Sequence, residues 1–219
     1  SGAAKVIDLT NTLMDVASTS GPDYIGDDIY LDGSGNSSKA ISGLRLALDD
    51  GSTYTTYGGI TRSSGAAAGT ESFAVSGQVD TTGGTFTYGL MNQRFQDAVI
   101  GREKPDLIVT TQSIWNLWWD RAQQSQRFNA GDERNNMASI GFDSLVFNGA
   151  DVVVDSNVPS GQVFMLNTRW MKMICHTNRM WTFTDWKYPT NQDAMIGQLL
   201  WAGELVAQQP RLCSFISNV

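Results

Sequence analysis

Residues suited to catalysis or metal binding are scarce in this sequence. Its 219 residues include one histidine and two cysteines, and Cys175 and Cys213 lie in separate apolar runs without a metal-ligand spacing. We therefore expect buried free thiols made in a reducing compartment, not a disulfide framework or a zinc site. No apolar run approaches the roughly 20 residues of a membrane-spanning helix, and no signal peptide is recognisable. These features predict a soluble protein made in a cytoplasm.

Charge is scarce as well, and its balance is acidic. Charged residues make up 17% of the chain against 41% hydrophobic residues, and the net charge is −7. The apolar fraction is too high for a disordered chain. An acidic protein repels phosphate, which argues against direct nucleic-acid binding though not against enclosing nucleic acid.

The central stretch of the chain is a strand followed by a helix rich in tryptophan. Residues 106–111 form a short β-branched apolar run, and the residues after them repeat at helical spacing. Each tryptophan ring can bury about 150–250 Å², so we expect this helix to lie against a core, with an exposed aromatic platform as the alternative. The expected core residues are Leu107, Ile108, Val109, Ile114, Trp115, Leu117, Trp118, Val152, Val154, Phe164 and Leu166.

Two further helices follow from apolar spacing. The first covers residues 6–17, has an apolar face of Val6, Leu9, Leu13 and Val16, and stops at residues 18–22. The second covers residues 88–100 and has Gly101 as its C-terminal stop. In both segments, the apolar spacing predicts an amphipathic helix.

The remaining pattern predicts strands and one loose excursion. We expect strands at residues 145–147, 151–155, 163–166, 170–175 and 181–183, and one long strand at 195–207. Residues 49–84 are rich in Gly, Ser and Thr, which predicts an extended, poorly packed segment.

No group of residues makes a convincing active site. His176 follows Cys175 on a strand, where adjacent side chains point to opposite faces, so a structural histidine is favoured over a catalytic pair. Asp151 and Asp155 share a strand face without a second acidic cluster, which favours solvation or turn capping over a metal or acid/base site. The acid pairs at 27–28 and 49–50 are interpreted as solvated loops. Glycines near residues 33 and 58 lack a phosphate-loop ending. We predict no catalytic residue, no cofactor and no metal.

The order of several short segments carries a resemblance to a known family. These segments are ISGL (41–44), YGGITR (57–62), PDLIVTT (105–111), QRF (126–128), GF (141–142), FNGADVVVD (147–155), FMLNT (164–168) and GELV (203–206). Together they resemble major capsid proteins of tailed phages of the Hong Kong 97 type. Such proteins usually carry an N-terminal arm and an extended loop before the spine helix ends. Nothing here corresponds to either, so we expect both to have been cleaved, truncated or trimmed.

The resemblance implies an α+β fold of two subdomains. The peripheral subdomain, with the C-terminal part of the spine helix and long strands, would comprise residues 1–31 and 168–204. The axial subdomain would comprise residues 32–167 and 205–219. Val6, Leu9, Leu13 and Val16 would then form the spine-helix face.

The function implied is structural and non-enzymatic. The chain would assemble with its own copies, as pentamers and hexamers, into the icosahedral head of a phage or prophage around double-stranded DNA, in the bacterial host cytoplasm. Portal, scaffold and maturation protease are the further partners implied, without sequence-specific nucleic-acid binding or membrane contact. Two alternatives stay open: a bacterial nanocompartment shell, and a secreted carbohydrate-binding module with exposed, coplanar aromatic rings.

Overall fold

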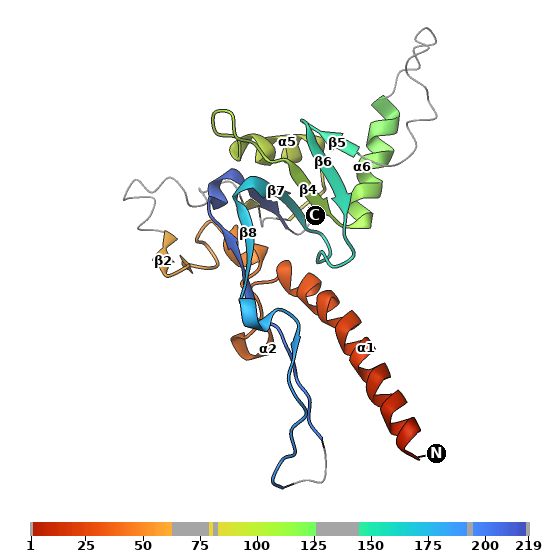
Figure 1. Ribbon diagram of the computed structural model, residues 1–219. Coiled ribbons are helices and arrows are strands. Elements are labelled where there is room, and N and C mark those ends of the chain that lie inside the picture. Colours follow the sequence, from red (N-terminus) through yellow and green to blue (C-terminus); the bar gives the residue numbers. More distant parts are fainter. Residues whose placement is uncertain (1, 63–78, 81–82, 126–144, 192–194, 218–219) are drawn as a thin grey trace. The chain divides into compact units, whose positions relative to one another are not determined.

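The chain divides into two compact units. The computed structural model describes residues 2–62, 79–80, 83–125, 145–191 and 195–217, and the side chains of residues 2–10 and 121–125 lie outside this description. Unit 1 comprises Ser1–Leu44 and Lys172–Val206, and unit 2 comprises Arg45–Met171 and Ala207–Val219 (Figure 1).

The first boundary between the units falls at residue 44, later than the expected residue 31. Two contacts tie the intervening segment to unit 1. The backbone N–H of Ser42 donates to Glu204 Oε1 at 2.6 Å. Gly43 lies so close to the carbonyl oxygens of Asp28 and Leu31 that an added Cβ would approach them to 2.6 and 2.4 Å.

A six-stranded mixed sheet forms the centre of unit 2, and its strands β4, β5, β6 and β7 are labelled in Figure 1. Its strands, in spatial order, are β3 (Val79–Asp80), β12 (Ser214–Ile216), β7 (Val163–Leu166), β4 (Leu107–Thr110), β6 (Ala150–Val154) and β5 (Leu145–Phe147). β4 runs parallel to β6 and antiparallel to β7. β12 is antiparallel to β7 and parallel to β3, and β5 is antiparallel to β6. The expected strand at 106–111 thus lies in the middle of the sheet, which explains its continuous apolar character.

Two helices, α5 (Tyr88–Asp97) and α6 (Gln112–Ser125), pack on the sheet and close its main core. Met91 and Phe95 of α5 and Ile114 and Trp118 of α6 belong to one cluster of buried side chains. The strand members of the cluster are Ile108, Ala150, Val152, Val163, Met165 and Ile216. In both helices, the two buried residues four positions apart therefore face the sheet.

Most of the expected core residues are buried, with one clear exception. The buried ones are Ile108, Val109, Ile114, Trp118, Val152, Phe164 and Leu166, and the half-buried ones are Leu107, Trp115 and Val154. Leu117 is 45% exposed, so its assignment to the core was wrong. The row of Ile114 and Trp118 faces the sheet, and Leu117 is turned about 100° around the helix from Trp118.

Helix α5 ends earlier than its apolar spacing predicted. Thr87 caps its start, since the side-chain oxygen accepts the N–H of Leu90. The helix ends at Asp97, and Gly101 belongs to the following tight turn, in which Ile100 and Glu103 exchange backbone hydrogen bonds. The positive φ of 62° at Gly101 serves that turn and not the helix end.

Short elements complete unit 2. They are the strands β1 (Thr56–Tyr57) and β2 (Ile60–Thr61) and the 3₁₀ turns η2 (Thr168–Trp170) and η4 (Pro210–Leu212); α3 (Leu44–Ala47) spans the boundary. β1 and β2 form an antiparallel hairpin whose turn is Gly58-Gly59, both with positive φ. This turn type needs left-handed backbone at both positions, which explains the two glycines.

The first helix of unit 1 is much longer than expected. α1 runs Gly2–Ile29, so the predicted stop at residues 18–22 was wrong, and Pro22 lies inside the helix. Ser18 and Thr19 instead donate their hydroxyl groups to the carbonyl of Asp15, an arrangement that bends helices without ending them. A proline in a helix removes one backbone hydrogen bond, but the apolar and acidic pattern continues past it.

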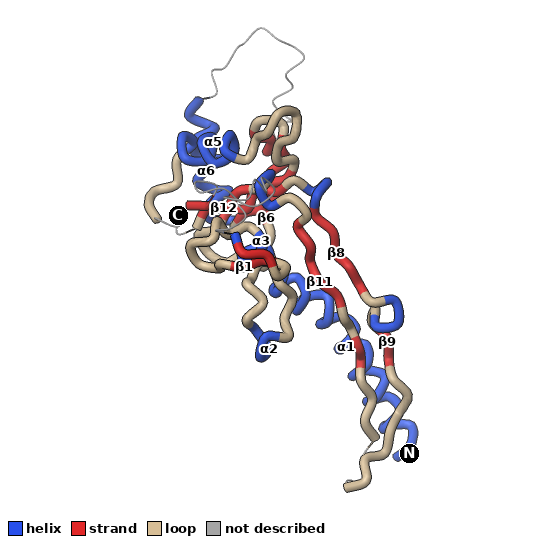
Figure 2. The backbone as a smooth tube through the Cα atoms, turned by 90° about the vertical axis from the view of Figure 1, so that its left-hand side faces the viewer, coloured by secondary structure: helices blue, strands red, loops and turns tan. Residues whose placement is uncertain are grey.

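A narrow two-stranded ribbon makes up most of the rest of unit 1 (Figure 2). Its elements are β8 (Met171–Cys175) paired with β11 (Gly203–Ala207), and β9 (Thr182–Phe183) paired with β10 (Leu199–Leu200), with η3 (Thr177–Arg179) between β8 and β9. The long strand expected at 195–207 is therefore interrupted. Unit 1 also contains α2 (Gly35–Ser38), whose Asn36 and Ser37 have left-handed φ values.

Candidate functional site

The residues considered for catalysis serve local structure. His176 Nδ1 accepts the backbone N–H of Asn178 at 3.2 Å and so caps η3. Asp155 Oδ1 accepts the N–H of Asn157 at 2.9 Å, which is the turn-capping role, while Asp151 is exposed. Within the part of the chain that the structure describes, no group of three or more His, Cys, Asp or Glu residues is placed to hold a metal ion.

The second acid pair contains a buried carboxylate and not a solvated loop. Asp49 is 5% exposed, and its Oδ2 accepts the backbone N–H groups of Gly51, Thr53 and Tyr54 at 2.8–3.2 Å. A carboxylate that gathers several N–H groups fixes the path of a loop. The first pair, Asp27 and Asp28, lies in α1.

Arg62 is the counterpart of this carboxylate. Its side chain is 3% exposed, and the guanidinium donates to the carbonyl oxygens of Leu46, Ala47 and Asp49. It also stacks over the Tyr57 ring at 5.4 Å. Burial lowers the pKa of the Arg62 guanidinium, and the negative charge of Asp49 opposes part of that shift. The segment expected to be poorly packed is therefore anchored at residues 49–62 by the buried guanidinium of Arg62.

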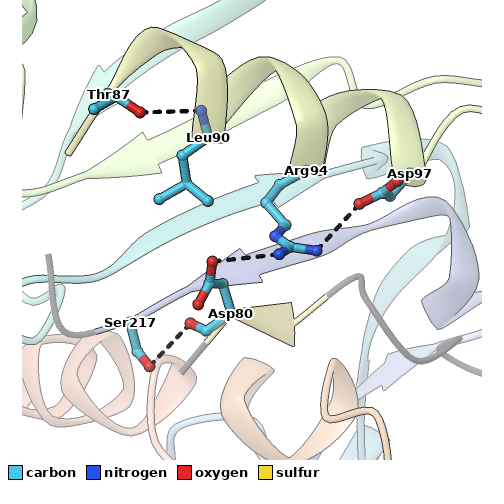
Figure 3. Close-up of polar contacts among 6 residues, drawn as sticks. All are labelled: Asp80, Thr87, Leu90, Arg94, Asp97 and Ser217. Carbon is cyan, nitrogen blue, oxygen red and sulfur yellow. Dashed lines mark hydrogen bonds and ion pairs between the residues drawn. The ribbon is translucent and has the colours of Figure 1, made fainter. Parts of the chain in front are cut away.

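An ion-pair cluster anchors the other described part of that segment (Figure 3). Arg94 of α5 reaches Asp80 Oδ2 at 3.3 Å and Asp97 Oδ2 at 3.2 Å. The Asp80 carbonyl accepts both the N–H and the hydroxyl of Ser217, at 2.8 and 3.3 Å. These contacts hold β3 against β12 and α5, which is a structural role.

The aromatic residues of α6 do not make an open platform. Trp118 is 3% exposed and meets Tyr88 and Phe147 edge to face, with ring centroids 6.3 and 5.6 Å apart. Trp115 is half-buried and stacks on Trp119 at 5.5 Å. A carbohydrate platform needs coplanar rings facing water, and on α6 the rings face each other or the core.

The two cysteines lie in different units and in different surroundings. Both are free thiols; Cys175 is half-buried and Cys213 is buried. Burial raises the pKa of the Cys213 thiol to about 12, opposed in part by the backbone N–H of Asn167, which donates to its sulfur. A thiol with so high a pKa stays protonated and is a poor nucleophile.

Unit 1 differs from these sites because its apolar side chains are exposed. Leu13 and Val16 of α1 are 60% and 57% exposed, and the side chains of Val6 and Leu9 lie outside the described part. The other exposed large apolar residues of this unit are Tyr24, Leu31, Met173, Ile174, Met180, Phe183, Trp186, Tyr188, Met195 and Ile196. A monomeric protein rarely leaves so many together, so this surface is the candidate functional site.

Part of this surface is an apolar groove between α1 and the ribbon. Its volume is about 870 Å³, and Leu13, Met14 and Ala17 line it from α1. From the ribbon, Phe183, Trp186, Met195, Ile196, Gly197 and Leu199 line it. One turn further along α1, Gly21 lies so close to the Trp181 ring that an added Cβ would approach it to 2.1 Å. Glycine at this position lets the helix and the ribbon meet.

Comparison with known proteins gives a similarity of fold. No protein-family model matches the sequence, and no curated protein matches it. A solved structure described as the capsid asymmetric unit of cyanophage A-1(L) is similar, with a TM-score of 0.64 over 98% of this chain and 69% of that chain, at 15% sequence identity. The chain has a phage capsid-like fold.

This capsid-like fold has a mixed α+β architecture with a helix and a sheet, as the resemblance implied. Of the segments that carried the resemblance, residues 126–128 and 141–142 lie outside the described residues. No helix in the described ranges is both long and apolar enough to cross a membrane.

Sequence reasoning missed the second half of the exposed surface on α1. Asp23, Tyr24 and Asp27 belong to the helix, but Pro22 indicated that the helix had already ended. A usable signal was present, because Val16, Tyr24 and Asp27 keep the helical spacing across the proline. The buried hydrogen bonds of Asp49 and Arg62 to the backbone, in contrast, have no recognisable signal in the sequence.

Proposed function

We propose that this chain is a structural shell protein, the major capsid protein of a tailed phage or prophage. It assembles with copies of itself into pentamers and hexamers of an icosahedral head that encloses double-stranded DNA. Its place is the virion capsid, assembled in the bacterial host cytoplasm. The similarity of fold to the cyanophage capsid unit over nearly the whole chain is the observation that carries the proposal.

The distribution of apolar side chains supports the same proposal. A shell subunit needs a stable body and a surface that neighbours cover. Unit 2 has a closed core, and unit 1 exposes apolar residues along α1 and the ribbon. We assign unit 1 to the peripheral subdomain and unit 2 to the axial subdomain of a Hong Kong 97 type fold.

The charge of the chain suits a container for DNA. A net charge of −7 on a shell protein keeps packaged DNA from binding tightly to the wall. Contacts with phosphate are then non-specific and weak. The protein has no catalytic role in this proposal, and portal, scaffold and maturation protease are its further partners.

Assembly of the full gene product that carries this sequence tests the proposal. We expect light scattering and negative-stain electron microscopy to show closed particles or capsomers of uniform size. A full-length product that stays monomeric at high concentration, with and without its phage partners, would contradict the proposed function. Particles filled with an enzyme cargo in place of DNA would identify a nanocompartment.

A further inference from the structure

One side of α1 carries apolar and acidic side chains that face water. Val16 and Tyr24 are 57% and 71% exposed, and Asp23 and Asp27 are exposed as well. Their separations of three, four, seven and eight residues place all four on one side of the helix. Residues 11–29 contain four aspartates and no lysine or arginine. We call Val16, Asp23, Tyr24 and Asp27 the acidic stripe.

The ribbon carries an exposed surface of the opposite charge. Lys172 and Ile174 lie on one face of β8 and are exposed. On the other face, Met171 and Cys175 are half-buried and Met173 is 39% exposed. Arg179 and Met180, which end the turn η3 after β8, are exposed as well, and Met180 is 62% exposed. We call Lys172, Ile174, Arg179 and Met180 the basic patch.

Among the residues that the structure describes, no ion pair uses the charges of these two surfaces. The three ion pairs found among the described residues are Arg94 with Asp80 and Asp97, and Arg169 with Glu103, all in unit 2. In the described part of unit 1, no ion pair joins α1 to the ribbon. The acidic stripe and the basic patch are both free to bind another molecule.

We propose that the acidic stripe of one copy binds the basic patch of a second copy. This contact rests on the proposed function and specifies which surfaces of the shell protein meet. The two surfaces match in kind, since each combines two apolar side chains with two charges of one sign. Like charges disfavour pairing of two stripes or of two patches, so the charges select the mixed contact and fix its register.

The arrangement also explains how such a contact can repeat. Each copy has one acidic stripe and one basic patch, so every copy can bind one neighbour through the stripe and another through the patch. A head-to-tail contact of this kind closes into rings when the rotation between copies allows it. The contact would remove four apolar side chains from water, and their burial would supply most of its affinity. These are Val16, Tyr24, Ile174 and Met180.

Charge reversal in the full gene product tests the contact. The acidic variant carries Asp23→Lys and Asp27→Lys, and the basic variant carries Lys172→Glu and Arg179→Glu. Each places like charges opposite one another, so we expect the assembled fraction in sedimentation velocity to fall at least about tenfold. The variant with all four changes restores opposite charges, and its assembly should return to within about threefold of the parent.

Mixing the two double variants guards against a folding defect. Each should be folded by circular dichroism and fail to assemble alone, and a mixture of the two should assemble because each supplies the surface that the other lacks. Two variants matched in charge change control for net charge. They are Asp120→Lys with Asp151→Lys, and Arg45→Glu with Arg102→Glu, all at exposed positions of unit 2.

The outcomes separate the contact from the proposed function. Parent-like assembly of either double variant, failure of both the fourfold variant and the mixture to recover, or an equal loss in the control variants would overturn the contact. The proposed function would stand in each of these cases. Failure of the parent protein itself to assemble would instead contradict the proposed function.

Discussion

Unit 2 buries most of its large apolar side chains, whereas unit 1 exposes many of its own. In unit 2, the cluster around Trp118 and Phe95 is sealed between two helices and the sheet, and Phe164 is fully buried. In unit 1, Met180 and Tyr188 are 62% and 74% exposed. Composition alone does not separate the units, because both are rich in apolar residues.

The difference shows what each unit needs for stability. A helix-covered sheet of six strands buries enough apolar area to be stable alone, but a two-stranded ribbon is marginal without a further layer. Unit 1 gains that layer from α1 over only part of its length, so much of its apolar surface stays exposed.

The largest effect is expected in the core of unit 2. Trp118→Ala should lower the free energy of unfolding by about 3–5 kcal/mol in a urea melt, because it leaves a cavity among packed aromatic rings. Leu117→Ala, at the exposed neighbouring position, is the matched control and should cost less than about 1 kcal/mol. A loss below about 1 kcal/mol for Trp118→Ala would instead place the Trp118 ring at the surface.

The next effect concerns the buried cation of unit 2. Arg62→Met should cost about 2–4 kcal/mol, because the carbonyls of Leu46, Ala47 and Asp49 lose their donor and the Asp49 carboxylate loses its nearest positive charge. Arg45→Met, at an exposed position of α3, should stay within about 0.5 kcal/mol of the parent. The same urea melt measures both variants. An Arg62→Met variant with the free energy of unfolding of the parent would show that the contacts of Arg62 and Asp49 do not stabilise the fold.

A smaller, local effect is expected in unit 1. Gly43→Ala would bring a Cβ to 2.4–2.6 Å from the carbonyl oxygens of Leu31, Ile29 and Asp28, and backbone atoms there have little room to move. We expect a loss of about 1–3 kcal/mol, seen as faster hydrogen exchange at the end of α1 and in β11 while α5 and β4 stay protected. Gly35→Ala is the control, since its Cβ would meet Ala40 at an ordinary 3.4 Å. Uniformly faster exchange in both units would show that they unfold as one.

The smallest effect is on thiol chemistry and compares the cysteine of each unit. At pH 8 a thiol reagent should modify Cys175 in the native protein far faster than Cys213, whose pKa is raised to about 12. The variants Cys175→Ser and Cys213→Ser assign the rates. Since the unfolded thiol ionises near pH 8.5, burial of the protonated Cys213 favours the native state below that pH, and this advantage is lost as pH rises toward 12. Rapid native labelling of Cys213 would refute its burial.

The success of sequence reasoning follows the same division. Strands and helices of unit 2 could be predicted because burial imposes a period on them, as in β4 and in the row of Ile114 and Trp118 on α6. The end of α1 could not, because a proline and three hydroxyl residues indicated a stop that the longer pattern overrode. Predictions for exposed acids also failed where the fold buried one, as at Asp49.

The sequence by itself determined the apolar periods, the acidic balance and the scarcity of catalytic groups, because these depend only on which residues are present and how they are spaced. Tertiary structure alone decided which apolar side chains are enclosed and which face water. Long-range packing makes that choice: Ile114 and Leu117 carry the same kind of side chain three residues apart, yet only Ile114 meets the sheet. The exposed stripe on α1 and the patch on the ribbon are products of that packing.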